Sequence, residues 1–181
     1  MNEPMIKALV LSCSLNPNSN SAKLAEYAKD YLDEQNIPTG HMDLRKFDMP
    51  FCGVDGAYDH ESAGKLKQAI EEADAVLLAA PVYNYDLNAA AKNVIELTGS
   101  AWENKVVGFM CAAGGSRSYM SSIGLANSLM FDFRSYIVPR FVYATRADFE
   151  VDDVDGEVKE RINALVDATL RLATGLALTS D

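Results

Sequence analysis

The chain has 181 residues, the size of one domain, and is acidic, with 16 Lys and Arg against 26 Asp and Glu and a formal net charge of −10. Its 49% of hydrophobic and 23% of charged residues are typical of a soluble folded protein and exclude a disordered or membrane-spanning chain. The negative charge disfavours nucleic acid and anionic membrane surfaces as partners, because phosphate-rich surfaces repel it. We therefore expect one soluble domain over residues 1–181.

Short hydrophobic runs alternate along the chain with segments of helical periodicity. Continuous hydrophobicity is typical of strands that are buried on both faces of a sheet, and apolar residues at every third or fourth position are typical of helices with one buried face. In chain order, these patterns predict a strand at residues 5–11, a helix at 24–32, a strand at 39–44, a helix at 66–73, a strand at 75–80, a helix at 88–97, a strand at 105–111, a helix at 118–133, a strand at 136–143 and a helix at 158–172. The segment 39–44 is the least strand-like of these. The alternation predicts an α/β fold, a parallel sheet of five strands with helices on both faces.

The loop after the first predicted strand, residues 12–21, contains four Ser and three Asn and leads directly into a helix. In open parallel sheets, ligands bind beyond the carboxyl ends of the strands, where this loop lies. The loop has neither the G-x-G-x-x-G nor the G-x-x-x-x-G-K-[ST] pattern. Hydroxyls, side-chain amides and backbone N–H groups at a helix N-terminus can still hold a phosphate without Lys or Arg. The alternative is a helix cap with a polar turn, although one cap needs one such residue rather than seven.

Two further loops follow predicted strands at the same edge of the sheet. Residues 81–86 place Pro81, Tyr83 and Asn84 where aromatic and backbone groups suit a flat heteroaromatic ring. Residues 112–117 bring Gly114 and Gly115, whose backbone allows close approach to a ligand. A phosphate at the first loop and a planar ring at the other two describe a mononucleotide, of which FMN is the commonest in such folds.

The cysteines are Cys13, Cys52 and Cys111, which are odd in number and widely separated. They offer neither a disulfide framework nor a C-x-x-C pair, and we expect no metal site and a cytoplasmic location. Cys13 lies within the first loop, where it is either a redox-sensitive thiol or, as we favour, a small buried residue.

The motifs in these loops resemble the NAD(P)H-dependent FMN reductase family over roughly residues 5–175. Residues 13–21 are similar to the family's Gly-Ser-x-Arg-x-x-Ser loop, with Asn16 where many members have Arg. Pro81-x-Tyr83-Asn84 and the downstream Lys92-Asn93-x-Ile95 match the family's Pro-x-Tyr-Asn and Leu-Lys-Asn-x-Ile pattern. Asn88 begins the segment that replaces the usual Pro-Gly-x-Leu.

The resemblance implies a three-layer flavodoxin-like fold with strand order 2-1-3-4-5. It implies hydride transfer from NADPH or NADH to FMN, and then to a small-molecule electron acceptor such as free flavin or a quinone. The flavin carries the chemistry, so no protein side chain is expected to be catalytic. Members of the family are usually homodimers or homotetramers, and some deliver reduced FMN to a flavin-using monooxygenase. The alternative is a non-enzymatic FMN-binding electron carrier or redox sensor.

The cofactor-binding residues that we predict lie in the three loops. Arg117 is the candidate cation for flavin or dinucleotide charge, with an ion pair to Glu96 or Asp132 as the competing interpretation. The full predicted set is Ser12, Ser14, Asn16, Ser19, Asn20, Ser21, Pro81, Val82, Tyr83, Asn84, Gly114, Gly115, Ser116 and Arg117.

Overall fold

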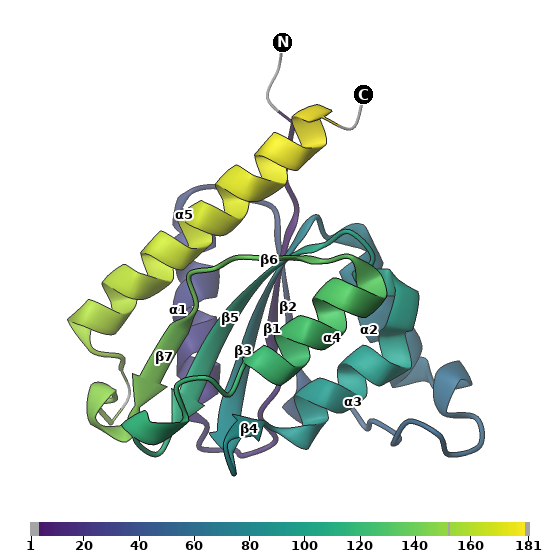
Figure 1. The fold of residues 1–181 in the computed structure, drawn as a ribbon, viewed down its shortest axis with the longest axis horizontal. Coiled ribbons are helices and arrows are strands. Elements are labelled where there is room, and N and C mark those ends of the chain that lie inside the picture. Colours follow the sequence, from purple (N-terminus) through teal and green to yellow (C-terminus); the bar gives the residue numbers. More distant parts are fainter. Residues whose placement is uncertain (1–3, 152, 180–181) are drawn as a thin grey trace.

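A parallel sheet forms the centre of the molecule in a computed structural model that describes residues 4–151 and 153–179. The strands run in the order β2-β1-β3-β5, and both β6 and β7 pair with the outer side of β5 (Figure 1). The bounds are β1 Ala8–Ser12, β2 Thr39–Asp43, β3 Ala75–Tyr83, β4 Asp86–Leu87, β5 Val106–Ala113, β6 Tyr136–Ile137 and β7 Val142–Thr145. The predicted α/β class and strand order are confirmed.

Helices cover both faces of the sheet, α1 and α5 on one side and α2, α3 and α4 on the other (Figure 1). Their bounds are α1 Asn20–Glu34, α2 Glu61–Glu72, α3 Ala89–Thr98, α4 Ile123–Phe133 and α5 Gly156–Thr179. Side chains alternate along each strand, so that Leu9 and Leu11 enter the core under α2 and α3 while Val10 enters the core under α1 and α5. Two buried cores thus explain the continuous hydrophobic runs of the sequence. Within the described residues, no helix is long and apolar enough to cross a membrane.

The predicted count of five strands is wrong, because the sheet has seven. The fifth predicted strand is divided into β6 and β7 by a segment that contains Pro139, which has no N–H to donate to the ladder. The extra strand β4 folds back antiparallel onto the end of β3. Asn84 and Tyr85 make that turn with φ angles of 52° and 67°.

The helix predicted at residues 118–133 begins later, at Ile123. The preceding residues form the short 3₁₀ helix η4, Ser116–Ser118, followed by turns. Ser118 Oγ lies 2.9 Å from the hydroxyl of Tyr143 on β7, a contact that fixes this segment to the sheet edge instead of to α4. The third loop is therefore longer than the periodicity indicates.

Gly108 allows α5 to approach β5, and its substitution tests the packing. A Cβ there would lie 3.0 Å from side-chain carbons of both Leu165 and Leu77. We expect Gly108→Ala to destabilise the fold by about 1–3 kcal/mol through overpacking. Urea unfolding followed by circular dichroism measures the change. The control is Gly64→Ala in α2, where a Cβ meets nothing within 4 Å and helix propensity predicts a gain of about 0.5–1 kcal/mol. If the two variants were equally stable, the close approach of α5 to β5 at Gly108 would be contradicted.

Candidate functional site

The loops that follow β1, β3 and β5 meet in one cleft of about 250 Å³ at the carboxyl edge of the sheet. Its position is the one expected for ligands of open parallel sheets. The lining residues are Ser14, Asn16, Asn18, Ser19, Asn20, Ser21, Pro81, Val82, Tyr83, Ala112, Ala113, Gly114 and Arg146. The structure thus brings together nine of the predicted site residues, from all three predicted loops.

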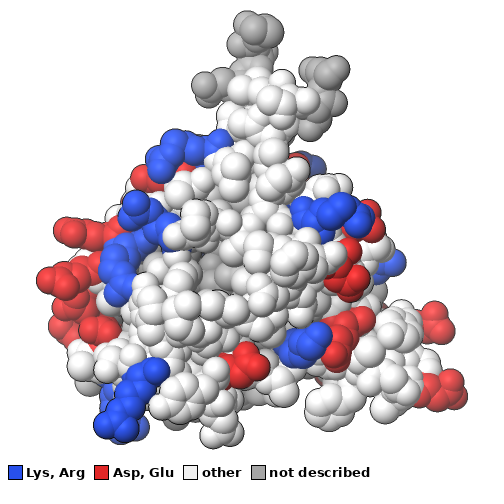
Figure 2. Space-filling model, viewed as in Figure 1, with Lys and Arg blue, Asp and Glu red and all other residues white. Residues whose placement is uncertain are grey.

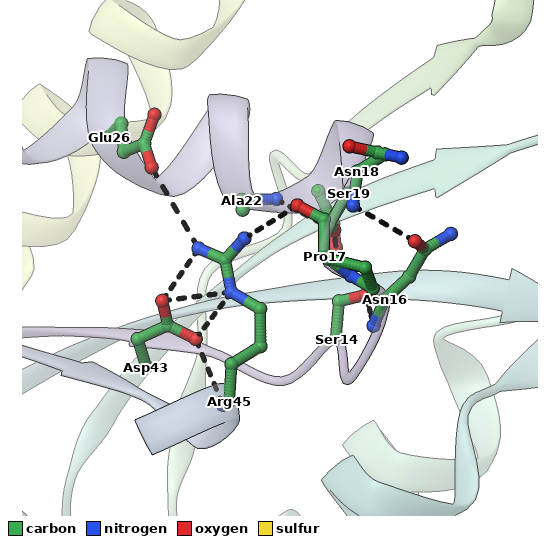
Figure 3. A network of polar contacts seen from close by, with 10 residues as sticks. Ser14, Asn16, Pro17, Asn18, Ser19, Ala22, Glu26, Asp43 and Arg45 are labelled. Atoms are coloured by element: carbon green, nitrogen blue, oxygen red, sulfur yellow. Dashed lines mark hydrogen bonds and ion pairs between the residues drawn. The ribbon is translucent and has the colours of Figure 1, made fainter.

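Polar side chains of the first loop shape the loop itself. Ser14 Oγ accepts a hydrogen bond from the backbone N–H of Asn16 at 3.2 Å, and Asn16 Oδ1 accepts one from Asn18 N–H at 2.9 Å (Figure 3). Ser19 is the N-cap of α1, since its Oγ accepts from Ala22 N–H at 3.1 Å. The predicted cap is therefore present, and further hydroxyls and amides remain along the cleft.

Arg45, which follows β2, supports this loop from outside the cleft. Its Nε donates to both oxygens of Asp43 at 3.0 Å, and its Nη2 lies 2.6 Å from Asp43 Oδ2. Its Nη1 donates to the backbone carbonyl of Pro17 at 3.2 Å, and Glu26 of α1 lies 3.9 Å away (Figure 3). A guanidinium is suited to this role because its donors point in several fixed directions. Arg45 thus joins the end of β2 to the first loop.

Asp43 is 5% exposed, so its charge depends on Arg45. Burial raises the pKa of this carboxyl, but hydrogen bonds from the Arg45 side chain and backbone, together with the guanidinium charge, hold the pKa below its ordinary value. The carboxylate stays ionised, and the pair is close to neutral as a unit. Arg45 therefore contributes rigidity to the loop more than positive potential.

Arg146 is the charged residue among those that line the cleft, and no motif in the sequence predicted it. It begins the short 3₁₀ helix η5, Arg146–Asp148, directly after β7. Asp148 Oδ2 fixes this turn by accepting from Thr145 N–H at 2.6 Å and from Thr145 Oγ1 at 2.9 Å. Within the described residues, Arg146 forms no ion pair. The sequence signal that could have identified Arg146 is its position directly after a fourth strand, which ends at the same edge of the sheet as β1, β3 and β5.

The second loop is tied to the first through Asn88. Asn88 Nδ2 donates to the backbone carbonyl of Cys13 at 2.8 Å, across 75 residues of sequence. Asn88 Oδ1 and Ser12 Oγ are buried nearby and have no hydrogen-bond partner within the described chain. Tyr83, by contrast, is 54% exposed at the cleft. The two loops are held as one unit with an accessible aromatic edge.

Five predicted site residues do not line the cleft. Ser12 is buried in the end of β1, and the Gly115 carbonyl accepts from the Tyr143 hydroxyl at 2.5 Å. Arg117 is exposed and forms no ion pair within the described residues, so the pairing with Glu96 or Asp132 is not observed. The full set outside the lining is Ser12, Asn84, Gly115, Ser116 and Arg117, whose cofactor contacts stay a prediction.

Cys13 is a buried structural residue. It is 0% exposed, and burial raises the pKa of its thiol far above the ordinary value. Burial likewise raises the pKa of Cys111 to about 12. Neither thiol ionises near neutral pH, so the first loop offers hydroxyls and amides instead of a thiolate nucleophile.

The architecture and the position of the cleft define a flavodoxin-like α/β protein. A flavodoxin from the domain Archaea shares this fold with a TM-score of 0.62 and 12% identity, over 92% of this chain and 99% of that one. An apo NADH:FMN oxidoreductase structure (EMOB) shares it with a TM-score of 0.78 and 19% identity, over 97% of this chain and 91% of that one.

The chain belongs to the NADPH-dependent FMN reductase family, whose pattern matches residues 6–149. An NAD(P)H-dependent FAD/FMN reductase of Geobacillus thermodenitrificans (strain NG80-2) is 27% identical over 128 residues, 68% of this chain and 69% of that protein. An NAD(P)H:quinone oxidoreductase of Solanum tuberosum is 28% identical over an alignment that covers 96% of each chain. The family resemblance of the loop motifs is confirmed.

Removing the Arg45 side-chain charge tests its support of the first loop. We expect Arg45→Met to lower the free energy of unfolding by about 2–3 kcal/mol, because it leaves the Asp43 carboxylate buried without its partner. Asp43→Asn in the same background should recover part of the loss. Urea unfolding of the single and double variants measures both effects, and additive losses would contradict the pairing.

The pair of Asp43 and Arg45 also predicts the direction in which the stability of the fold changes with pH. The pKa of Asp43 is lowered in the folded state, so its stabilisation is present above the unfolded-state pKa of about 3.9 and is lost as pH falls through the folded pKa. Arg45→Met removes the side-chain hydrogen bonds and the guanidinium charge but keeps the backbone N–H bond to Asp43, so burial offsets more of the lowering of the pKa. The stability lost between about pH 6 and pH 3 should therefore be smaller in the variant, and unfolding titrations that give equal losses for the two proteins would contradict this.

Proposed function

We propose that the protein is an FMN-dependent NAD(P)H oxidoreductase. It would transfer hydride from NADPH or NADH to FMN and then to a small-molecule acceptor such as free flavin or a quinone. The observation that carries the proposal is the cleft at the carboxyl edge of the sheet, which joins an uncharged polar loop at the start of α1 to two loops with exposed backbone. The flavin and quinone reductases among the relatives support the same reaction class.

The first loop and Arg146 suit a phosphate monoester. Ser14, Ser19 and Ser21 present hydroxyls next to the N-terminus of α1, whose dipole favours an anion. Arg146 adds a full positive charge from the end of β7, the strand that pairs with β5. Among the described residues that line the cleft, none is a carboxylate that would repel the ligand.

The other two loops suit a planar ring. The segments 81–83 and 112–114 end the neighbouring strands β3 and β5, where Pro81 pairs with Ala112 in the register. Their backbone groups would bond ring nitrogens and oxygens, and Tyr83, which lines the same cleft, would border the ring. When FMN is bound, its ring supplies the hydride-accepting chemistry. The chain would orient the ring and leave one edge open to the second substrate.

We also propose that the protein forms a homodimer or homotetramer. A groove of about 630 Å³ between α3 and α4 is bordered by Tyr58, which is 63% exposed, and Phe131, which is 83% exposed. Exposed aromatic side chains around a groove of this size are typical of protein contacts.

The three free cysteines support a cytoplasmic location. A flavin-using monooxygenase as a further partner is part of the proposal and rests on the family resemblance.

One set of measurements tests the proposed activity. We expect the purified protein to bind FMN, seen as quenching of flavin fluorescence, and to oxidise NADPH or NADH when FMN or a quinone is added. FMN binding without nicotinamide oxidation would favour the alternative function, a non-enzymatic electron carrier or redox sensor. No FMN binding at micromolar concentrations would overturn both interpretations.

Arg146 should discriminate between FMN and riboflavin, which lacks the phosphate. We expect Arg146→Gln to weaken FMN binding about tenfold, because one charge-assisted hydrogen bond at a partly hydrated site is lost. Riboflavin affinity should change less than twofold. The control is Arg171→Gln, an exposed arginine of α5 outside the cleft. An equal loss for both flavins would contradict a phosphate contact.

A further inference from the structure

A second hollow borders the third loop and shares no lining residue with the cleft. It measures about 300 Å³ and is lined by Tyr119, Pro139, Arg140, Phe141 and Arg161. Arg140 and Phe141 belong to the segment between β6 and β7, and Arg161 belongs to α5. Lys and Arg side chains, blue in Figure 2, lie over the first half of α5 and near the tip of β7, on the left of the view, with a group of Asp and Glu side chains, red, beside them.

The two arginines of this hollow lack acidic partners. Within residues 4–151 and 153–179, neither Arg140 nor Arg161 forms an ion pair, and no carboxylate lines the hollow. Arg161 Nη1 donates to the backbone carbonyl of Tyr143 at 3.1 Å, which fixes its position and leaves its other donors available. Two unpaired guanidinium groups around one hollow, on a chain with a net charge of −10, indicate an anion site.

Aromatic rings form another wall of the hollow. The ring centroids of Tyr119 and Phe141 are 4.9 Å apart, and those of Tyr119 and Tyr143 are 5.5 Å apart. Tyr119 is 49% exposed, so part of this aromatic surface is open to a ligand. The Tyr119 and Phe141 rings are tilted by 43° to each other, so a base can pack against the exposed part of Tyr119 while its phosphates meet the two arginines. This combination suits a nucleotide, which carries a base and phosphates together.

The hollow is connected to the FMN cleft through the third loop and β7. The Tyr143 hydroxyl donates to the carbonyl of Gly115, which adjoins the cleft residue Gly114. Tyr119 in the hollow follows Gly114 in the cleft by five positions, at most about 17 Å of extended chain. An extended dinucleotide can span such a distance with its nicotinamide at the cleft and its adenosine at the hollow.

We propose that this hollow binds the adenosine phosphates of the nicotinamide co-substrate. The inference rests on the proposed function, since it assigns a second contact area to the same hydride donor. Arg140 and Arg161 hold the phosphate oxygens, and Tyr119 with Phe141 packs against the adenine. These residues determine affinity for the co-substrate and do not touch the reacting atoms.

Steady-state kinetics of the FMN-loaded protein test the assignment. We expect Arg140→Gln to raise the KM for NADPH about tenfold, and the double variant with Arg161→Gln to raise it further. The kcat and the FMN dissociation constant should stay within twofold. Arg171→Gln, on the same helix as Arg161, should leave the KM unchanged. An unchanged KM in the double variant would overturn the assignment.

A binding measurement without FMN separates this inference from the proposed function. Adenosine 2′,5′-bisphosphate is titrated calorimetrically into the full chain, with inorganic phosphate as a second probe. We expect the nucleotide to bind more tightly than phosphate and to bind at least tenfold more weakly to Arg140→Gln, which keeps the Arg161 bond to the fold. The assignment would be overturned if inorganic phosphate bound as tightly as the nucleotide. It would also be overturned if Arg140→Gln bound the nucleotide as tightly as the unsubstituted protein. Failure of FMN binding in a chain that still binds the nucleotide would count against the proposed function alone.

Discussion

Burial of the sheet on both faces is the constraint on which the site depends. Every residue of β1 and β5 is buried, so these strands have no place for exposed polar side chains along their length. Polar groups can reach solvent only where the strands end, and parallel strands end at one edge. The first loop, the turn between β3 and β4, and the third loop therefore meet there without any need for long-range contacts between their own side chains. The fold therefore places the ligand-binding groups together at one edge of the sheet, whatever the role of each group.

Charge is distributed unevenly over this edge. Arg45 lies close to the first loop, but Asp43 and Glu26 offset its charge, and it acts by holding Pro17 in place. Arg146 lacks such a partner in the described chain and faces the cleft. The acidic balance of the whole molecule therefore does not describe the potential at the site. A local cation and a helix N-terminus dominate there, because distant surface charges are screened within about 10 Å.

The sequence predicted the features that depend on local pattern. Hydrophobic runs identify β1, β3 and β5, and the Ser/Asn-rich segment identifies the first loop, because burial and helix capping act on neighbouring residues. Arg146 and the pair of Arg140 and Arg161 were not predicted. Their roles depend on how β7 pairs with β5 and where α5 crosses it, and such register is set by contacts between distant parts of the chain. Periodicity also does not show that Pro139 divides the fifth strand.

The two departures from the family's motifs have a common physical consequence. Asn16, where many members have Arg, supplies an acceptor for the N–H of Asn18, which a guanidinium cannot do. Asn88, in the segment that replaces the usual Pro-Gly-x-Leu, donates its side-chain amide to the carbonyl of Cys13. Both asparagines thus bond the first loop internally or to its neighbour. The loop loses a cation but gains fixed geometry, while Arg146 supplies positive charge from a different strand. Binding strength at the site then comes from preorganised donors as much as from charge, because less conformational entropy is lost when the ligand binds.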